Sequence, residues 1–196
     1  MSTRYKIRDP EGLYFLTSTV VGWIDVFTRK AYKNIIIDSL QFCQKIKGLQ
    51  VFAYVIMSNH IHMIAKADEG LNLVNIMGDF KKYTARKIID EILTSGKESR
   101  KDWLLYALAL YAKQNRRQDQ DYQLWQSDNH PVLLASPKFI YQKLNYIHNH
   151  PVKSGIVNVA AHCIYSSAGY YETGEGVLPV TVIDLGVSEG YVWMGL

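Results

Sequence analysis

The sequence has few cysteines and no long uninterrupted apolar segment. Its two cysteines, Cys43 and Cys163, lie far apart and in no metal-binding spacing, so we interpret them as reduced thiols that pack in the interior. The longest apolar stretch, residues 13–27, is interrupted by Thr, Ser, Gly and Asp and is too short and too polar to cross a bilayer. The first residues are polar and lack the apolar region of a signal peptide. We therefore expect a cytoplasmic protein without a membrane partner.

The bulk composition is that of an ordinary globular protein. Hydrophobic residues make up 48% and charged residues 20% of the 196 residues, which supplies a core and argues against disorder. The net charge of +4 permits nucleic-acid binding without indicating it, because many unrelated proteins are equally basic. No internal repeat or low-complexity linker is present. We expect one domain over residues 1–172, followed by a tail, residues 173–196, that packs on the domain or on a partner.

Hydrophobic periodicity predicts the main elements. Alternating β-branched and aromatic residues indicate strands, and apolar residues at three- and four-residue steps indicate helices. The predicted strands are 13–21, 50–56 and 60–66, and the predicted helices are 32–47, 71–94 and 137–149. Residues 101–122 are ambiguous, residues 123–134 contain a further strand, and Pro151 ends the last helix. This order predicts an α+β sandwich whose mainly antiparallel sheet carries helices on one face.

Two histidines share one face of a predicted strand. His60 and His62 are two residues apart, so their imidazoles leave the same side of the strand, whereas Ile61 and Met63 leave the other side toward the core. Two imidazoles on one face can converge on one metal ion. A His-x-His pattern alone is more often a pair of surface or hydrogen-bonded histidines, because two ligands rarely hold a metal without others.

A tyrosine and a further histidine share one face of the last predicted helix. Tyr146 and His150 are four residues apart, so His150 can supply a third ligand while Tyr146 stands beside the metal. Alone, this pair also fits a packed helix end with a histidine that favours the helix dipole. Together the clusters suggest phosphoryl chemistry: a tyrosine hydroxyl is a weak nucleophile, and a divalent ion polarises the phosphate that it attacks. A phosphotyrosine ester then keeps the bond energy for rejoining.

Several segments resemble known single-strand transposases. VIMSNHIHMIA is similar to the His-hydrophobe-His strand of the HUH transposases, and LWQSDNHP, YIHNHPVKSGIV and YSSAGYY resemble the REP-associated tyrosine transposases. The opening LYFLTSTVVGWIDVF resembles the first strand in one branch of that family. The resemblance covers roughly residues 10–172. It implies a ferredoxin-like fold, binding of hairpin-bearing single-stranded DNA, and cleavage that leaves a 5′-phosphotyrosine and a free 3′-OH, by a monomer or a homodimer.

The resemblance also assigns roles to individual residues. His60 and His62 match the two metal histidines and Tyr146 matches the nucleophile. The position four residues after the tyrosine usually holds Asn or Gln, whereas here it is His150. The expected cofactor is a divalent metal, Mg²⁺ or Mn²⁺, but three imidazoles suit Mn²⁺, Zn²⁺, Co²⁺ or Ni²⁺ better than Mg²⁺. His150 therefore either shifts the metal preference or marks reduced activity. Ser58, where the family more often has Pro, should matter only to the turn.

Basic residues provide candidate DNA contacts. On the predicted helix 71–94, a phosphate track with Tyr83 for stacking would be formed by Lys81, Lys82, Arg86 and Lys87. Lys153, just past the last predicted helix, is a further candidate phosphate contact. The run Lys113–Arg117 is weaker because Asp119 and Asp121 follow it. Trp125 is expected in the core, and His130 is a spare ligand or DNA contact at most.

Three functions follow from these residues. The first is a metal-dependent DNA-strand transferase, the second a non-cleaving protein that holds DNA hairpins, and the third an unrelated metallohydrolase built on the three histidines. They differ in whether Tyr146 becomes covalently joined to DNA.

Overall fold

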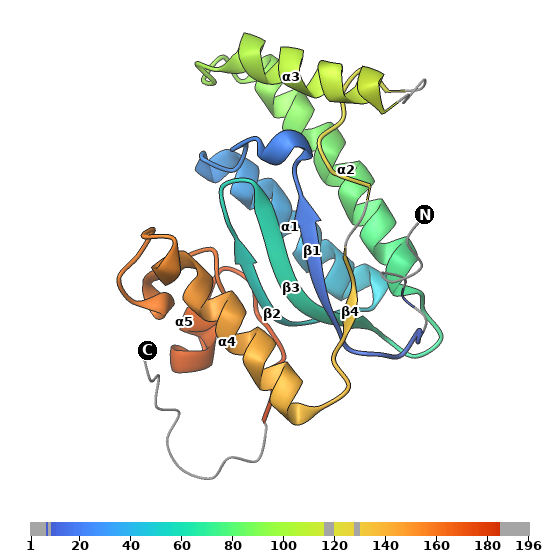
Figure 1. Cartoon of the computed structure of the whole chain (residues 1–196), viewed down its shortest axis with the longest axis vertical. Coiled ribbons are helices and arrows are strands. Elements are labelled where there is room, and N and C mark those ends of the chain that lie inside the picture. Colours follow the sequence, from blue (N-terminus) through green and yellow to red (C-terminus); the bar gives the residue numbers. More distant parts are fainter. Residues whose placement is uncertain (1–6, 8, 116–119, 128–129, 185–196) are drawn as a thin grey trace.

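One four-stranded antiparallel sheet, in the order β2-β3-β1-β4, organises the chain (Figure 1). The computed structural model describes residues 7, 9–115, 120–127 and 130–184. The strands are β1 (Tyr14–Thr19), β2 (Leu49–Ile56), β3 (His60–Ala67) and β4 (Val132–Leu133). The helices are α1 (Lys30–Lys47), α2 (Leu73–Thr94), α3 (Lys101–Gln114), α4 (Pro137–Lys153) and α5 (Ala168–Thr173), with short 3₁₀ turns η1 (Val21–Trp23) and η2 (Ala160–His162).

Helices α1 and α2 cover one face of the sheet. Ile61 and Met63 of β3 point to this face and join a core with Ile36 of α1 and Phe80 of α2. The apolar spacing that predicted α1 is thus the spacing of its buried side. Gly48, with φ +66°, ends α1 in the left-handed conformation that glycine adopts most readily.

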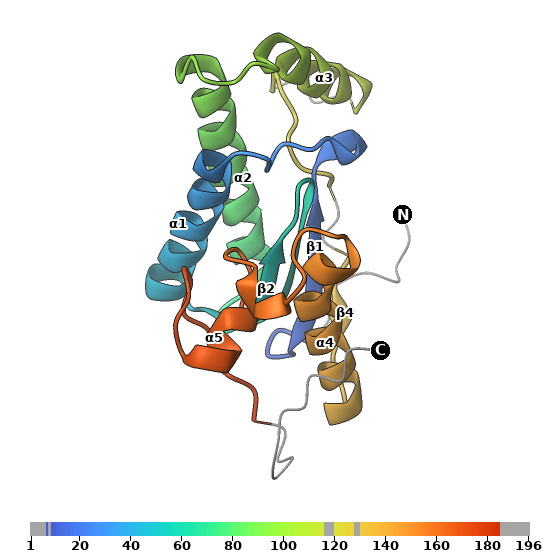
Figure 2. The same ribbon diagram turned by 90° about the vertical axis from the view of Figure 1, so that its left-hand side faces the viewer.

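Helix α4 covers the opposite face, as Figure 2 shows. Phe15 of β1, Val55 of β2 and Ile64 of β3 pack there against Leu144 and Ile147 of α4. The predicted α+β class and antiparallel sheet are confirmed, but the expectation of helices on one face is wrong. The physical reason is that the central strand β3 is buried on both sides along nearly its whole length, so each face needs its own cover.

Two segments behave differently from their prediction. The ambiguous stretch 101–122 forms α3 up to Gln114, with Leu104 and Leu108 buried on one side. Helix α4 begins at Pro137 as predicted, with the Ser136 hydroxyl accepting a hydrogen bond from the Phe139 amide, but it continues through Pro151 to Lys153. A proline lacks the amide proton, yet in the last turn this removes only one helical hydrogen bond, so the helix does not stop there.

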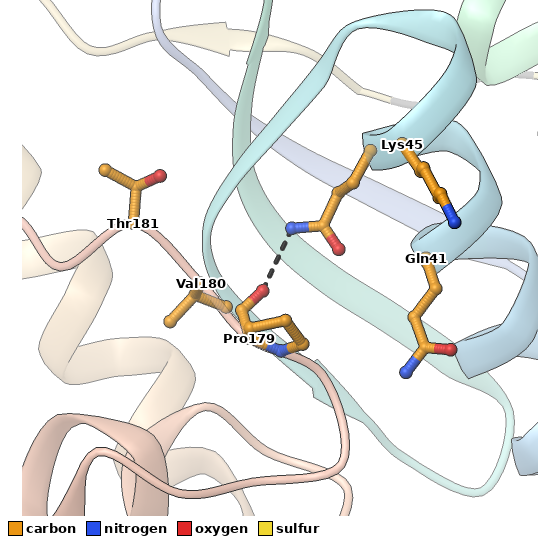
Figure 3. A pocket seen from close by; sticks show the side chains of 6 residues that line it. Gln41, Lys45, Pro179, Val180 and Thr181 are labelled. Atoms are coloured by element: carbon orange, nitrogen blue, oxygen red, sulfur yellow. Dashed lines mark hydrogen bonds between the residues drawn. The ribbon is translucent and has the colours of Figure 1, made fainter.

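Residues after α5 pack along α1 and the outer edge of β2. The Thr181 amide donates to the Val51 carbonyl over 2.9 Å, Gln44 donates to the Pro179 carbonyl over 2.9 Å, and Leu178 is fully buried. Figure 3 shows the depression that this segment forms with α1, which shares no residue with the histidine cluster described below. The division into a domain and a tail stays a prediction, and residues 185–196 of that tail lie outside the described residues. Within the described ranges no helix has the length and apolar character needed to cross a membrane.

Candidate metal and nucleophile site

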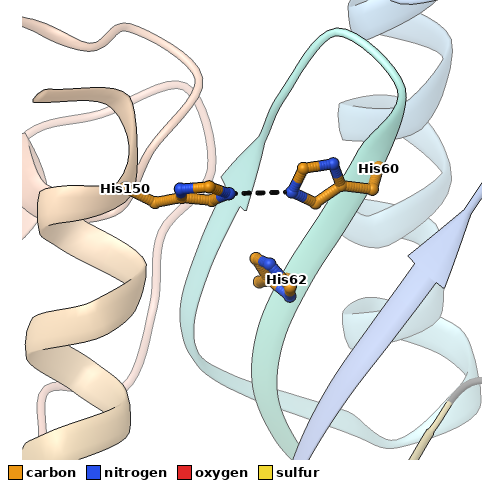
Figure 4. Close-up of side chains that lie close together, drawn as sticks. All are labelled: His60, His62 and His150. Carbon is orange, nitrogen blue, oxygen red and sulfur yellow. Dashed lines mark hydrogen bonds between the residues drawn. The ribbon is translucent and has the colours of Figure 1, made fainter. Parts of the chain in front are cut away.

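Three imidazoles meet between β3 and α4. His60 and His62 leave the face of β3 that α4 covers, and His150 projects toward them from the last turns of α4 (Figure 4). Their ligand atoms all lie within 4.8 Å of one another, and the Nε2 atoms of His60 and His150 are 2.9 Å apart. The structure therefore brings together the three histidines that the sequence singled out as ligands, from two segments far apart in the chain.

Polar neighbours orient two of these rings. Thr17, directly opposite His62 in the β1–β3 register, places its hydroxyl 2.8 Å from His62 Nδ1. His60 Nδ1 lies 2.7 Å from the side-chain oxygen of Asn59 and donates to it. With the proton on Nδ1 of both rings, both Nε2 lone pairs point into the cluster. Such partners are what fixes the tautomer of metal-binding histidines.

The cluster is buried enough to keep its imidazoles neutral. His60 is 9% and His62 7% exposed. Burial, reinforced by the neighbouring imidazoles, lowers the pKa of His62 to about 2 and that of His60 to about 4. Burial also lowers the pKa of His150. Neutral imidazoles have free lone pairs at physiological pH, which is the state that binds a metal ion.

The donor set fits a divalent ion of the first transition row. Two nitrogens 2.9 Å apart match adjacent ligands on one ion with metal–nitrogen bonds of about 2.0–2.1 Å. Among the described residues, the candidate ligand group contains three histidines and no carboxylate. All-imidazole donors favour Mn²⁺, Co²⁺, Ni²⁺ or Zn²⁺ over Mg²⁺, which prefers oxygen.

Tyr146 stands at the mouth of the cluster. Its hydroxyl is 3.4 Å from Nε2 of His62, and the residue is 41% exposed, so solvent reaches the ring. One helical turn separates Tyr146 from His150, and their rings stack with centroids 5.3 Å apart and planes 23° apart. The helical spacing of the two residues therefore places a hydroxyl beside the candidate ligands, as the sequence predicted.

A lysine that the sequence reasoning missed lies beside Tyr146. The Lys143 ammonium is 4.6 Å from the ring centre of Phe15 and 5.6 Å from that of Tyr146. It takes part in none of the ion pairs that the described residues form, which are Arg29–Glu98, Arg100–Glu98 and Lys47–Asp79. The available signal was its position three residues before Tyr146, on the same face of the helix.

The residues expected to contact DNA do not all lie near this cluster. Lys82, Arg86 and Lys87 are exposed on α2, which covers the other face of the sheet, and Lys87 lies over the ring of Tyr83. Lys81 is half-buried and donates to the Gln126 carbonyl over 2.5 Å. Lys153 ends α4 one turn from His150 and is exposed, and its charge contributes to the low pKa of that histidine. Of the five candidates, only Lys153 adjoins the histidine cluster.

The remaining sequence candidates fall outside the cluster. Trp125 is buried, as expected, and its indole donates to the Thr84 hydroxyl over 3.0 Å. His130 is exposed and does not join the three-histidine group. Part of the run Lys113–Arg117 lies outside the described residues.

Comparison with known proteins agrees with the motifs. Residues 24–106 match the family model described as "Transposase IS200 like", a stretch that contains His60 and His62 and ends before Tyr146 and His150. A solved structure of a REP-associated tyrosine transposase bound to a REP hairpin matches with a TM-score of 0.60 and 17% identity, covering 94% of both chains. No curated protein matches the sequence. The chain is therefore similar to the IS200-like transposases, which supports a transposase role, and it has the fold of a REP-associated tyrosine transposase.

Proposed function

We propose that this protein is a metal-dependent transposase that cleaves and rejoins single-stranded DNA near hairpins through a phosphotyrosine intermediate on Tyr146. The observation that carries the proposal is the 3.4 Å contact between the Tyr146 hydroxyl and His62 Nε2, inside a three-imidazole cluster. A nucleophile next to metal ligands is the arrangement that phosphoryl transfer requires. His60, His62, His150 and Tyr146 meet within one chain.

The reaction exchanges one phosphoester bond for another. The Tyr146 oxygen forms a bond to the scissile phosphorus, the bond from phosphorus to the 3′ oxygen breaks, and the tyrosine proton ends on the leaving 3′-OH. Because the new ester conserves the bond energy, attack by a 3′-OH reverses the step without ATP. A divalent ion held by His60, His62 and His150 would polarise the phosphate and neutralise its charge.

Lys143 supplies a second positive charge beside the nucleophile. Its ammonium lies over the rings of Phe15 and Tyr146, which hold it beside the place where a scissile phosphate meets the tyrosine hydroxyl. An ammonium in that position attracts the phosphate and stabilises the charge that builds up on its oxygens. We assign Lys143 this role in addition to the metal.

The proposed substrate is single-stranded DNA with a hairpin. The similar solved structure is described as bound to a REP hairpin, and the positive net charge of this chain favours a polyanion. Lys153, beside the cluster, is placed to contact the backbone near the cut. Lys82, Arg86 and Lys87 lie on the opposite side of the sheet, so they would contact DNA remote from the cut.

The test is formation of a covalent protein–DNA adduct. Labelled single-stranded DNA bearing a hairpin is incubated with wild type and Mg²⁺, Mn²⁺, Co²⁺, Ni²⁺ or Zn²⁺, and adducts are resolved on a denaturing gel. Wild type should form an adduct that a chelator abolishes. Tyr146→Phe should form none while keeping its DNA affinity. The matched control is Tyr141→Phe, a tyrosine of the same helix with 44% exposure, which should behave as wild type.

Two outcomes contradict the proposal in different ways. If wild type binds hairpin DNA but forms no adduct with any of these metals, the protein is a non-cleaving hairpin-binding relative. If Tyr146→Phe retains metal-dependent cleavage, the three histidines serve a hydrolytic reaction in which the tyrosine is not the nucleophile.

A further inference from the structure

An exposed tryptophan borders the histidine cluster on the side of the β1–α1 connection. Trp23 ends η1 and is 59% exposed, although tryptophan side chains usually bury most of their surface. Its indole meets the His60 imidazole edge to face, with ring centres 5.8 Å apart and planes 70° apart. The residues on either side of Gly22 and Trp23 are anchored in the core: Val21 and Ile24 are buried. The turn is thus fixed while its largest side chain faces solvent.

The backbone of this turn adopts a conformation that favours glycine. Gly22 has φ +60° and Trp23 has φ +56°, so two consecutive residues are left-handed. For a bulky residue such as tryptophan this conformation costs about 1–2 kcal/mol and is rare. A side chain on Gly22 would collide with the Tyr111 ring of α3, whose hydroxyl would lie 2.4 Å from a Cβ atom there. The space at residue 22 therefore admits only glycine, and the left-handed Trp23 beside it carries backbone strain of the kind that clusters at functional sites.

One side chain connects the turn to the candidate metal ligand. The Asn59 amide nitrogen donates to the Trp23 carbonyl over 3.1 Å and to the Asp25 carboxylate over 2.9 Å. The amide oxygen of the same residue accepts from His60 Nδ1. The position of the indole is consequently set relative to His60 by the residue that orients that histidine.

We propose that Trp23 is a stacking platform for an unpaired base of the single-stranded substrate, in one of the two nucleotides that flank the scissile phosphate. This inference rests on the proposed function. It adds a residue that binds a base to a site whose other residues act on the phosphate. An exposed, rigidly held indole offers a flat apolar face, and stacking on aromatic residues is how proteins hold single strands without reading their sequence. Its contact with His60 places that face within one nucleotide of the cluster.

The first test measures how strongly binding depends on bases. Affinities are measured by fluorescence anisotropy for an oligothymidylate and for an abasic oligonucleotide of equal length, with no metal present so that cleavage is absent. Wild type should prefer the oligothymidylate. Trp23→Ala should weaken binding of the oligothymidylate by about 5- to 150-fold. The same substitution should leave the affinity for the abasic strand unchanged, and Trp23→Phe should retain most of the preference.

A second exposed tryptophan serves as the matched control. Trp103 on α3 is 54% exposed and has no contact with the cluster, so Trp103→Ala should bind both strands as wild type does. Thermal unfolding of each variant shows that the fold is intact, and Trp23→Gly, which suits the left-handed backbone, replaces Trp23→Ala if the latter is unstable.

The two proposals fail separately. If Trp23→Ala and Trp23→Gly bind the oligothymidylate within twofold of wild type, the stacking role is wrong, whether or not wild type forms adducts. If the base preference disappears in these variants but wild type never forms a covalent adduct, the stacking site stands and the strand-transfer proposal is wrong.

Discussion

The Nε2 atoms of His60 and His150 lie 2.9 Å apart although 90 residues separate them in the chain. His60 belongs to β3 and His150 to α4. The distance between them therefore depends on the packing of Leu144 and Ile147 of α4 against the sheet. Two neutral imidazoles at this distance can both bind one metal cation. Most of the predictions below concern what this arrangement binds.

The identity of the third ligand should control metal preference. His150→Asn replaces an imidazole by an amide oxygen, so affinity for Ni²⁺ or Zn²⁺, measured by calorimetry, should fall by at least about tenfold. The ratio of Mg²⁺-supported to Mn²⁺-supported adduct formation should rise in the same variant, because Mg²⁺ prefers oxygen ligands. His162→Asn changes an exposed histidine of η2 and is the control. Unchanged metal affinity in His150→Asn would show that His150 is not a ligand.

The hydroxyl of Thr17 should support metal binding without touching the metal. Thr17→Val keeps the shape of the side chain but removes the partner of His62 Nδ1, which should lower metal affinity by about 10- to 100-fold. Thr17→Ser retains the hydroxyl and should bind metal nearly as wild type does. Equal affinities for the valine and serine variants, measured in one titration series, would contradict this role.

Lys143 should affect the rate of strand transfer. Lys143→Met preserves the length of the side chain and removes the charge near Tyr146, so the rate of adduct formation should fall by about tenfold or more. Lys138→Met changes an exposed lysine at the start of the same helix and should have little effect. If Lys143→Met forms the adduct at the wild-type rate with saturating DNA, Lys143 does not take part in the reaction.

A buried carboxylate outside the site should make stability depend on pH. Glu98 accepts from Arg29, Arg100 and Tyr32. Burial by itself would raise the pKa of Glu98, but the hydrogen bonds from Arg100 and Tyr32 outweigh it and lower the pKa from its ordinary value of 4.5 to about 2. A lowered folded-state pKa means that the ionised form stabilises the fold, fully above about pH 4.5 and progressively less as pH falls toward about 2.

Glu98→Gln should therefore lower the free energy of unfolding near neutral pH by about 2 kcal/mol. The difference from wild type in urea unfolding should shrink as the pH falls through that window. Glu69→Gln, at an exposed position, should show no such trend. A difference that is constant with pH would mean that the ionised Glu98 does not stabilise the fold.

The local sequence pattern predicted most of the elements, and it paired the site residues within each element. Alternation on β3 placed His60 and His62 on one face, and helical spacing placed Tyr146 beside His150, because both periodicities act within a few residues. The sequence did not reveal Thr17, since its place opposite His62 depends on the register between β1 and β3. Register is decided by the whole sheet and is not visible in either strand alone.

The second covered face of the sheet was missed for a related reason. A strand such as β3 that is apolar on both sides does not show which helix covers which side, so α4 was expected beside α1 and α2. The basic face of α2, which the sequence predicted as a phosphate track, lies across the sheet from the cluster. The exposure of Trp23 was missed because it occurs in a left-handed turn that the local sequence pattern does not reveal.

The stacked pair of Tyr146 and His150 occupies a single turn of α4. A helical turn is stiff, so whatever anchors the imidazole also anchors the hydroxyl, and neither can be displaced from β3 without the other. Tyr146 and His150 are thus held together on α4, whereas His60 and His62 are held on β3. Loosening of the contact between Ile147 and Ile64 would therefore move His150 and Tyr146 away from His60 and His62 at the same time.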